Sequence, residues 1–407
     1  MGQANIMVKS TITRHPLNRP RRSWQLRVAR WILWSSIGIA VLAPLIANDR
    51  PLFCICDRQW HWPAFRSIAE SLDWINPSSV KYDDCIAKVM PIIPFASSTL
   101  DPTSSGYNPP GTRSSSGMHW LGTDALGRDV MAGLIYGTRY AWIIGLGATL
   151  LAAMGGIMIG MMAGYWKNNL LKATVAQYIA LFIMIALGSY YYMIISWMWV
   201  GWTWLLVMIL YALVWGFILY WLWVFCAGRG RLLPVPVDHV IMRGIDVFES
   251  FPKMFLLMAL MVIFIRPSAL ALVGMIALIR WPLFVQIARA ETLKESTAAY
   301  VISAQNIGVT WYHIMFRHIW PNIKPALITT AIFSISASVL LEASLSFIGL
   351  GLRLERTTWG SLLNEGRQYL PGWWLAVFPG FAIFILILAL NWAYVSKANT
   401  EKSVEQI

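Results

Sequence analysis

Residues 374–395 read WLAVFPGFAIFILILALNWAYV, and none of them carries a charge. A helix needs about 20 apolar residues to cross the hydrocarbon core of a bilayer, which is roughly 30 Å thick. The stretch therefore predicts a transmembrane helix. The whole chain agrees, because 57% of its 407 residues are hydrophobic and only 13% are charged, whereas soluble proteins carry about 25% charged residues.

Seven further apolar runs of similar length occur along the chain. Each is long enough to span a bilayer, so we expect an all-α membrane protein, a polytopic helical bundle of about eight transmembrane helices. These runs cover residues 28–47, 140–165, 175–197, 203–227, 247–265, 269–287 and 326–350.

The distribution of charge predicts the orientation. Residues 1–27 form a basic tail, and residues 1–30 carry seven Lys or Arg and no acidic residue. Such residues beside a span stay in the cytoplasm, so we expect a cytoplasmic N-terminus and, after an even number of spans, a cytoplasmic C-terminus. We expect no nucleic acid as a partner, because the basic residues behind the net charge of +13 are not interleaved with aromatic residues outside the membrane.

Residues 48–118 are polar and rich in Ser, Pro, Gly and Asp, and we expect a small extracytoplasmic segment there. The segment contains Cys54, Cys56 and Cys85. In an oxidising compartment Cys85 could pair with Cys54 or Cys56, and free thiols fit the sequence equally well. No spacing of Cys and His predicts a metal site.

A long segment between two predicted spans, residues 289–324, is mixed in polarity. We expect short helices over Thr297–Asn306 and Trp311–His318, with Gly308 in the turn and Pro321 as a break before the next span. A helix-turn-helix on the cytoplasmic face is suited to docking on a partner. An ordinary surface loop fits the pattern equally well.

Gly156, Gly160 and Gly164 are spaced four residues apart in one predicted span. Small residues at this spacing allow two helix backbones to approach closely. The pattern fits a tightly packed pore helix and the general packing of any helical bundle equally.

Glu342 lies in or at the edge of a predicted span, where a buried carboxylate is costly. We favour a structural role, a hydrogen bond to a neighbouring helix, over a direct functional one. We interpret Asp246 and Glu249 in the same way, and Lys253 is spaced to pair with Glu249.

No sequence pattern predicts catalysis. The chain lacks the phosphate loop Gly-x-x-x-x-Gly-Lys-Ser/Thr and the motifs His-Glu-x-x-His and Gly-x-Ser-x-Gly. We interpret Asp124, Arg128 and Asp129 as residues that cap and orient a helix at the membrane surface through exposed ion pairs. We therefore expect a non-enzymatic chain. A membrane enzyme using residues 48–118 and a scaffold are the weaker alternatives.

Residues 300–308 read YVISAQNIG, and residues 316–322 read FRHIWPN. Both resemble the cytoplasmic loop of the C-type permease subunit of dipeptide, oligopeptide and nickel ABC importers. The family usually has Glu-Ala-Ala at positions 302–304 and leucine at position 320. The missing glutamate implies docking by shape and apolar contact. The coupling residues implied by the resemblance are Ile302, Ser303, Ala304, Gly308, Arg317 and Pro321.

Three further motifs are similar to the same family, in the same order. They are LGTDALGRDV at 121–130 with IYGTR at 135–139, RGIDV at 243–247 with Phe251-Pro252, and EASLSFIGLG at 342–351 with Trp359-Gly360 and EGR at 365–367. With the loop they cover about residues 119–395. Residues 46–52, IANDRPL, resemble the microcin and oligopeptide branch. The structural motif residues are Gly122, Thr123, Asp124, Gly127, Arg128, Asp129, Asp246, Pro252, Glu342, Gly349, Gly351, Trp359 and Gly360.

The chain differs from the family by two extra spans, about residues 175–227, where the family has a short cytoplasmic loop. Because the spans come as a pair, the topology after them is preserved. They are rich in Trp and Tyr and nearly free of charge, so we expect them at the periphery of the bundle.

The resemblance implies a type I ABC-importer permease fold and a chain that carries peptides or peptide-like solutes across the bacterial cytoplasmic membrane. Nickel or another small solute is the alternative cargo. The implied partners are a second permease subunit, two ATPase subunits that bind ATP and Mg, and an extracytoplasmic substrate-binding protein, with no cofactor on this chain. The implied divisions are a cytoplasmic basic tail (1–27), a first transmembrane anchor (28–47), an extracytoplasmic segment (48–118), a permease domain (119–397) and a cytoplasmic tail (398–407). The permease domain contains a two-span insert at about 169–236 and a cytoplasmic coupling loop at about 291–322.

Overall fold

The computed structural model describes residues 20–56, 59–61, 87–104, 106–115, 117–166, 172–174, 214–215, 232–234, 237–263, 268–352 and 357–404. The chain divides into two compact units. Unit 1 contains Met1–Ala153, Met254–Arg280 and Ile328–Ile407, and unit 2 contains Met154–Lys253 and Trp281–Leu327. The predicted extra pair of spans lies outside the described residues, apart from positions 214 and 215.

In this described part of the chain, five helices are long and apolar enough to cross a membrane, which confirms five of the predicted spans. The helices extend beyond the apolar runs. The second begins ahead of its run because the Asp129 carboxylate accepts a hydrogen bond from the Ala132 amide (2.8 Å) and so caps its first turn. The five helices are α1 (Pro20–Ile46), α3 (Val130–Trp166), α8 (Ala269–Ser296), α11 (Trp320–Ile348) and α13 (Trp374–Val404).

The prediction of one continuous span over residues 247–265 is wrong. The chain instead forms α6 (Val237–Ser250) and α7 (Lys253–Ile263), and the helix is interrupted at Phe251 and Pro252. Proline has no backbone N–H to donate and disfavours helical geometry in the residue before it. The Phe-Pro pair therefore ends α6 and begins a new helix.

The segment between α1 and α3 holds short β-structure. One antiparallel sheet has the strand order β2-β1-β3, and a second pairs β4 with β5. Cys54 is buried, whereas Cys85 lies outside the described residues, so the predicted pairing stays a prediction. The elements are β1 (Phe53–Cys56), β2 (Gln59–His61), β3 (Ala87–Val89), the 3₁₀ turn η1 (Pro102–Ser104), β4 (Thr112–Arg113) and β5 (Met118–His119).

Two further strands lie at the ends of the predicted insert. β6 (Lys172–Thr174) pairs antiparallel with β7 (Leu232–Pro234), and Thr174 is opposite Leu232. The two ends of the predicted insert are therefore adjacent in space.

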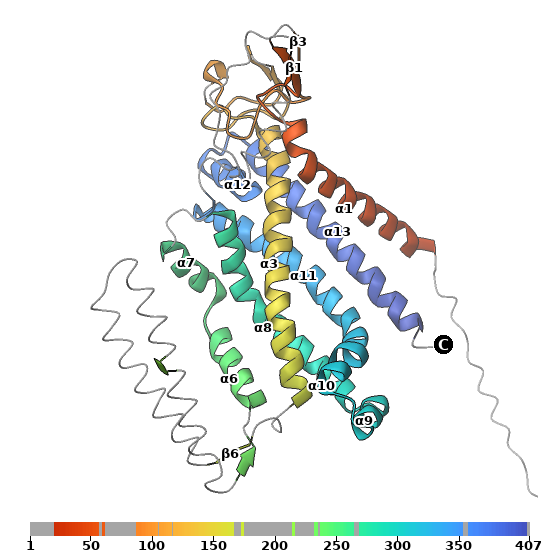
Figure 1. Ribbon diagram of the computed structural model, residues 1–407. Helices are drawn as coiled ribbons and strands as arrows, with labels where there is room; N and C mark the ends of the chain where they lie inside the picture. The colour runs from red at the N-terminus through yellow and green to blue at the C-terminus, as the bar shows by residue number, and fades with distance from the viewer. Residues whose placement is uncertain are drawn as a thin grey trace, which may run out of the picture. The chain divides into compact units, whose positions relative to one another are not determined.

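In unit 1, α1 lies beside α13, and the short helix α12 (Trp359–Gln368) packs on α13 (Figure 1). A hydrophobic cluster joins α3, α11 and α13, with Ala141, Val339 and Leu386 among its buried members, and Leu33 of α1 packs against it. This core holds four membrane helices together.

In unit 2, α3 packs on α8 through the predicted glycine stripe. A Cβ atom on Gly160 would lie 2.5 Å from the Val285 carbonyl oxygen, and one on Gly164 would lie 2.7 Å from that of Arg289. Gly156 would meet Trp281 and Phe284 just as closely. The backbones are too close for any larger residue, which confirms the close approach that the spacing predicts.

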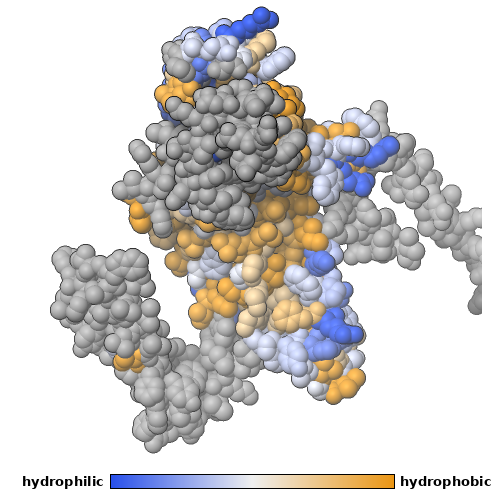
Figure 2. Space-filling model, turned by 45° about the horizontal axis from the view of Figure 1, so that its top comes forward, coloured by the Kyte–Doolittle hydropathy of each residue, from blue (hydrophilic) through white to orange (hydrophobic). Residues whose placement is uncertain are grey.

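The surface of the long helices is largely hydrophobic, as Figure 2 shows. On α1, Trp31 and Trp34 are exposed, and on α3 Leu150 and Met154 are exposed. Apolar side chains on the outside of long helices are what a lipid environment requires.

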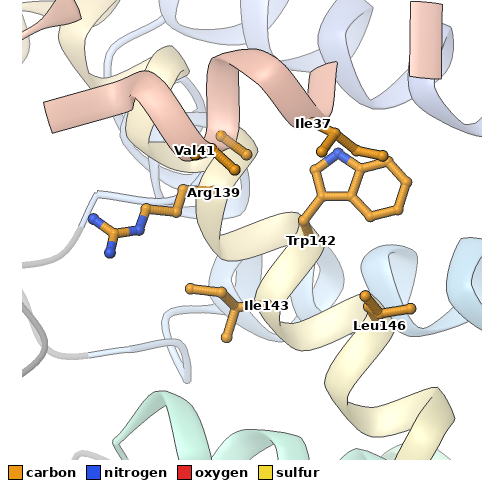
Figure 3. A pocket seen from close by; sticks show the side chains of 7 residues that line it. Ile37, Val41, Arg139, Trp142, Ile143 and Leu146 are labelled. Atoms are coloured by element: carbon orange, nitrogen blue, oxygen red, sulfur yellow. The ribbon is translucent and has the colours of Figure 1, made fainter. Parts of the chain in front are cut away.

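A hollow of about 480 Å³ lies between α1 and α3 (Figure 3). Apolar side chains dominate it, and Arg139 extends from its edge (Figure 3). Its lining residues are Ile37, Ala40, Val41, Arg139, Trp142, Ile143 and Leu146.

Candidate coupling surface and buried ion network

Helix α9 (Ala299–Asn306) ends in a glycine turn. The Gly308 amide donates to the Gln305 carbonyl (3.0 Å), and the Val309 amide donates to that of Ala304 (3.1 Å). This pair of bonds is the Schellman motif, in which the residue after the helix takes a left-handed conformation. Gly308 has φ +83°, which confirms the turn predicted from the sequence.

After this turn the chain forms α10 (Trp311–His313), which continues through a π-helical segment (Ile314–Ile319) into α11. The prediction that Pro321 breaks the helix is wrong. A π-helical turn is wider than an α-helical one, and this one lies directly before Pro321 and accommodates the missing amide hydrogen. The second predicted short helix is therefore the beginning of a membrane helix.

A hydrophobic cluster lies on the buried side of these helices. Val301, Ile314 and Ile319 are fully buried in it, together with Met161 of α3 and Ala288 of α8. The turn is therefore packed against two membrane helices of unit 2.

The opposite side of α9 and α10 is exposed and carries several apolar side chains. Ile302 is 46% exposed and Ile307 is 82% exposed. Ala304, however, is only 9% exposed and belongs to the supporting cluster, so the structure corrects its predicted place among the contact residues. We define the coupling surface as Ile302, Ser303, Ile307, Gly308, Trp311, Tyr312, Phe316 and Arg317, with exposed Pro321 beside it.

The motif before α3 forms a buried ion network rather than the exposed ion pairs expected. Asp124 is 1% exposed, Arg128 7% and Asp129 3%. The prediction missed this burial because the partners come from distant parts of the chain. We call Asp101, His119, Asp124, Arg128, Asp129 and Glu365 the buried ion network.

His119 lies between two carboxylates. Its Nδ1 is 2.9 Å from Asp129 and its Nε2 is 3.3 Å from Asp101, and its ring stacks on Phe95. Burial disfavours the charged ring, but the hydrogen bonds and charges of Asp129 and Asp101 outweigh burial, so the pKa of His119 is raised. Burial acts on Asp101 as well, but hydrogen bonds from Ser114, Thr103 and His119 lower its pKa to about 2.

Arg128 links the other half of the network. Its Nε donates to Asp124 (2.5 Å) and its Nη2 donates to Glu365 of α12 (2.9 Å). Burial and the charge of Asp124 raise the pKa of Glu365 to about 7, against the opposing charge of Arg128.

The other residues of this motif set the chain path ahead of α3. Thr123 is fully buried, and its hydroxyl donates to the Gly106 carbonyl (2.7 Å). Gly122 and Gly127 both have positive φ.

Glu342 is 2% exposed, within α11. It accepts a hydrogen bond from Ser346 one turn later (2.7 Å) and is hydrogen-bonded by Thr358, the N-cap residue of α12. Both partners are neutral, and Thr358 belongs to a neighbouring helix, as the structural interpretation expects.

The remaining residues of that motif pack α12 against its neighbours. The Trp359 indole N–H donates to the Leu134 carbonyl of α3 (3.0 Å), and Gly360 lies directly against the Ala343 carbonyl of α11. Gly349 (φ +93°) ends α11, and Gly351 lies against Ser346.

The charged residues of the motif at α6 are more exposed than those of the buried ion network. The side chain of Asp246 is 54% exposed and pairs with Arg243 (3.2 Å), one turn earlier. Lys253 lies 4.0 Å from Glu249, as predicted, although the helix break separates the two. Pro252 forms that break.

Sequence reasoning did not identify two features. No sequence pattern identified Asp101 and His119 as part of the buried ion network, because neither belongs to a charged cluster in the sequence. Arg280 had a visible signal, a lone arginine inside a predicted span, that was overlooked. In the residues that the structure describes, no group of His, Cys, Asp or Glu is arranged to hold a metal ion.

Comparison with known proteins finds similarity to permease subunits of transport systems. Residues 224–396 match a family described as the inner membrane component of binding-protein-dependent transport systems. The chain is 27% identical to the inner membrane ABC transporter permease protein YejE of Escherichia coli, over 92% of this chain and 94% of that protein. It is 29% identical to the glutathione transport system permease protein GsiD of Pectobacterium atrosepticum, over 68% and 69%. It is 26% identical to the di/tripeptide transport system permease protein DppC of Pseudomonas aeruginosa, over 67% of each.

The earlier motifs, the polytopic helical fold and these matches agree. The chain is a multi-pass inner-membrane protein and a transport subunit rather than an enzyme. Residues 224–396 match the inner membrane component of binding-protein-dependent transport systems, and over most of its length the chain is similar to permease subunits of ABC importers.

Proposed function

We propose that this permease moves peptides or peptide-like solutes into the cytoplasm, driven by ATPases that dock on the coupling surface. The relatives named above include a permease for glutathione and one for di- and tripeptides, which favours peptides over nickel or another small solute. The orientation in which both termini are cytoplasmic is part of the proposal, on the basic N-terminal tail.

The coupling surface is the observation that carries the proposal. Ile302, Ile307 and Phe316 are exposed apolar side chains in and around a turn that is packed on a buried core. A group of such side chains outside the membrane marks a protein interface. Because Ile302 stands where the family usually has a glutamate, we expect the ATPase to be held by apolar contact rather than by an ion pair.

The proposed assembly contains this chain, a second permease subunit, two ATPase subunits and an extracytoplasmic binding protein. ATP and Mg²⁺ would be bound by the ATPases, since this chain has no phosphate loop. Closure of the ATPases would push the turn at Gly308 and shift the helices attached to the supporting cluster.

The test is reconstitution of the complete importer in proteoliposomes with a labelled tripeptide outside. We expect uptake that needs ATP, both ATPases and the binding protein, and no ATP hydrolysis by this chain when it is purified alone. Hydrolysis by the pure chain that a point change in it abolishes would contradict the proposal. Uptake of nickel but not of the tripeptide would contradict the proposed substrate.

A further inference from the structure

Arg280 is a charged residue near the middle of a membrane-spanning helix. It lies 11 residues after the start of α8 at Ala269. At 1.5 Å per residue this is about 16 Å along the helix, roughly half of the hydrocarbon thickness. A charge at such a depth is costly and marks a functional site unless a partner neutralises it.

Its hydrogen-bond partner in unit 1 is a hydroxyl group. Arg280 Nε donates to the Ser334 hydroxyl of α11 (3.3 Å), and the Thr149 hydroxyl of α3 donates to the same oxygen (3.2 Å). Among the described residues, Arg280 makes no ion pair with a carboxylate. By contrast, Arg128 and Arg289 both pair with carboxylates.

A second hydroxyl group on the same face of α11 has no hydrogen-bond partner among the described residues. Ser338 lies one turn after Ser334 on the same face of α11, and it is fully buried. Within the described residues its hydroxyl makes no hydrogen bond. Three hydroxyl-bearing side chains and one guanidinium thus gather where α3, α8 and α11 meet.

We propose that Arg280, with Ser334 and Ser338, binds the carboxylate of the solute as it crosses the membrane. A guanidinium presents parallel N–H groups that match the two oxygens of a carboxylate, and the hydroxyls supply further donors. Every peptide with a free C-terminus carries such a group. The inference rests on the proposed peptide transport and adds the part of the peptide that the permease recognises.

A first experiment does not depend on the solute. In the full importer, with the four natural cysteines replaced, Arg280→Cys should react with a hydrophilic methanethiosulfonate reagent in at least one nucleotide state. Ile279→Cys, at a neighbouring position that is 2% exposed, should not react. If Cys replacing Arg280 is unreactive in every state, the position faces protein or lipid, for example a carboxylate of the second permease subunit, and the inference is wrong.

A second experiment measures selectivity with trialanine and trialanine amide. Wild type should prefer the free acid, and Arg280→Gln should raise the KM for the acid by roughly tenfold or more, the effect of losing one charge-assisted hydrogen bond, without changing the KM for the amide. Arg280→Lys should retain the preference, and Ser344→Ala, whose hydroxyl bonds back to Leu340 of its own helix, should behave as wild type.

Equal loss of acid and amide transport in Arg280→Gln would overturn the inference in favour of a packing role. If wild type transports neither tripeptide while position 280 is reactive, the peptide assignment fails, and with it the proposed carboxylate ligand; the reactive position then shows only that water reaches Arg280.

Discussion

Replacing Gly308 by valine should weaken the coupling of this permease to its ATPase through the backbone alone. A Cβ atom at Gly308 would meet nothing within 4 Å, so the substitution creates no clash inside the chain. The φ of +83° is the obstacle. A left-handed conformation costs an ordinary L-residue about 1–2 kcal/mol, and a β-branched residue is a clear outlier there.

A cost of about 2 kcal/mol lowers the population of the native turn relative to alternatives by roughly 30-fold. If docking needs the native turn, the affinity for the ATPase should fall by up to this factor, because the apparent Kd rises in inverse proportion to the fraction of chains that hold the native turn. Gly308→Asn is the matched control, because asparagine tolerates the left-handed region at a helix C-terminus. We therefore expect small effects for asparagine, intermediate effects for alanine and the largest for valine.

The assay is co-purification of the ATPase with tagged permease, together with peptide-stimulated ATP hydrolysis in proteoliposomes. Membrane insertion of each variant is checked in parallel and should not change. If asparagine impairs docking as much as valine does, the partner excludes any side chain at this position, and the backbone argument is refuted. Wild-type behaviour of the valine variant would refute it as well.

Four further predictions follow from other features. Gly160→Ala should lower the thermal stability of the detergent-solubilised protein, because its Cβ would lie 2.5 Å from the Val285 oxygen and overpacking costs about 1–3 kcal/mol; Gly155→Ala, which meets nothing within 4 Å, should not. Burial raises the pKa of Glu365 from 4.5 to about 7. Between pH 4.5 and 7 the folded state therefore holds a proton that the unfolded chain has lost, and the stability of the folded state should fall as pH rises through that range. Glu365→Gln should flatten this pH dependence in thermal scans, and an unchanged slope would contradict the assignment. A cysteine at position 170 should be labelled by impermeant reagents from the cytoplasmic side alone, and labelling from outside would reverse the orientation. Deletion of residues 175–231, with Thr174 and Leu232 joined by an Asn-Gly turn, should preserve assembly with the second permease, because the ends of the insert are paired; loss of assembly by an inserted chain would show that the extra spans are not peripheral.

The features that the sequence predicted well are local and periodic. Apolar runs located five helices, because length and hydropathy alone decide whether a helix suits the bilayer. The spacing of Gly156, Gly160 and Gly164 indicated the contact with α8, although it could not indicate which helix was the partner. Gly308 was predictable because few residues other than glycine end a helix in this way.

The features that were missed depend on residues far apart in the sequence. Arg128 and Glu365 are 237 positions apart, so only the fold could show that their ion pair is buried. The effect of a proline also depended on its surroundings. Pro252 interrupts a helix, whereas Pro321 follows a π-helical turn and leaves its helix continuous.

The most direct test of the account is cross-linking of the coupling surface to the ATPase in the assembled importer. A cysteine carrying a photo-reactive group is placed at Ile302 or Ile307, and for comparison at Val301, which is fully buried in the same helix as Ile302. We expect adducts between permease and ATPase from positions 302 and 307, with yields that change when ATP is bound, and none from position 301. The absence of adducts from 302 and 307, in a complex that still retains the ATPase, would contradict the assignment of this surface as the mechanical link.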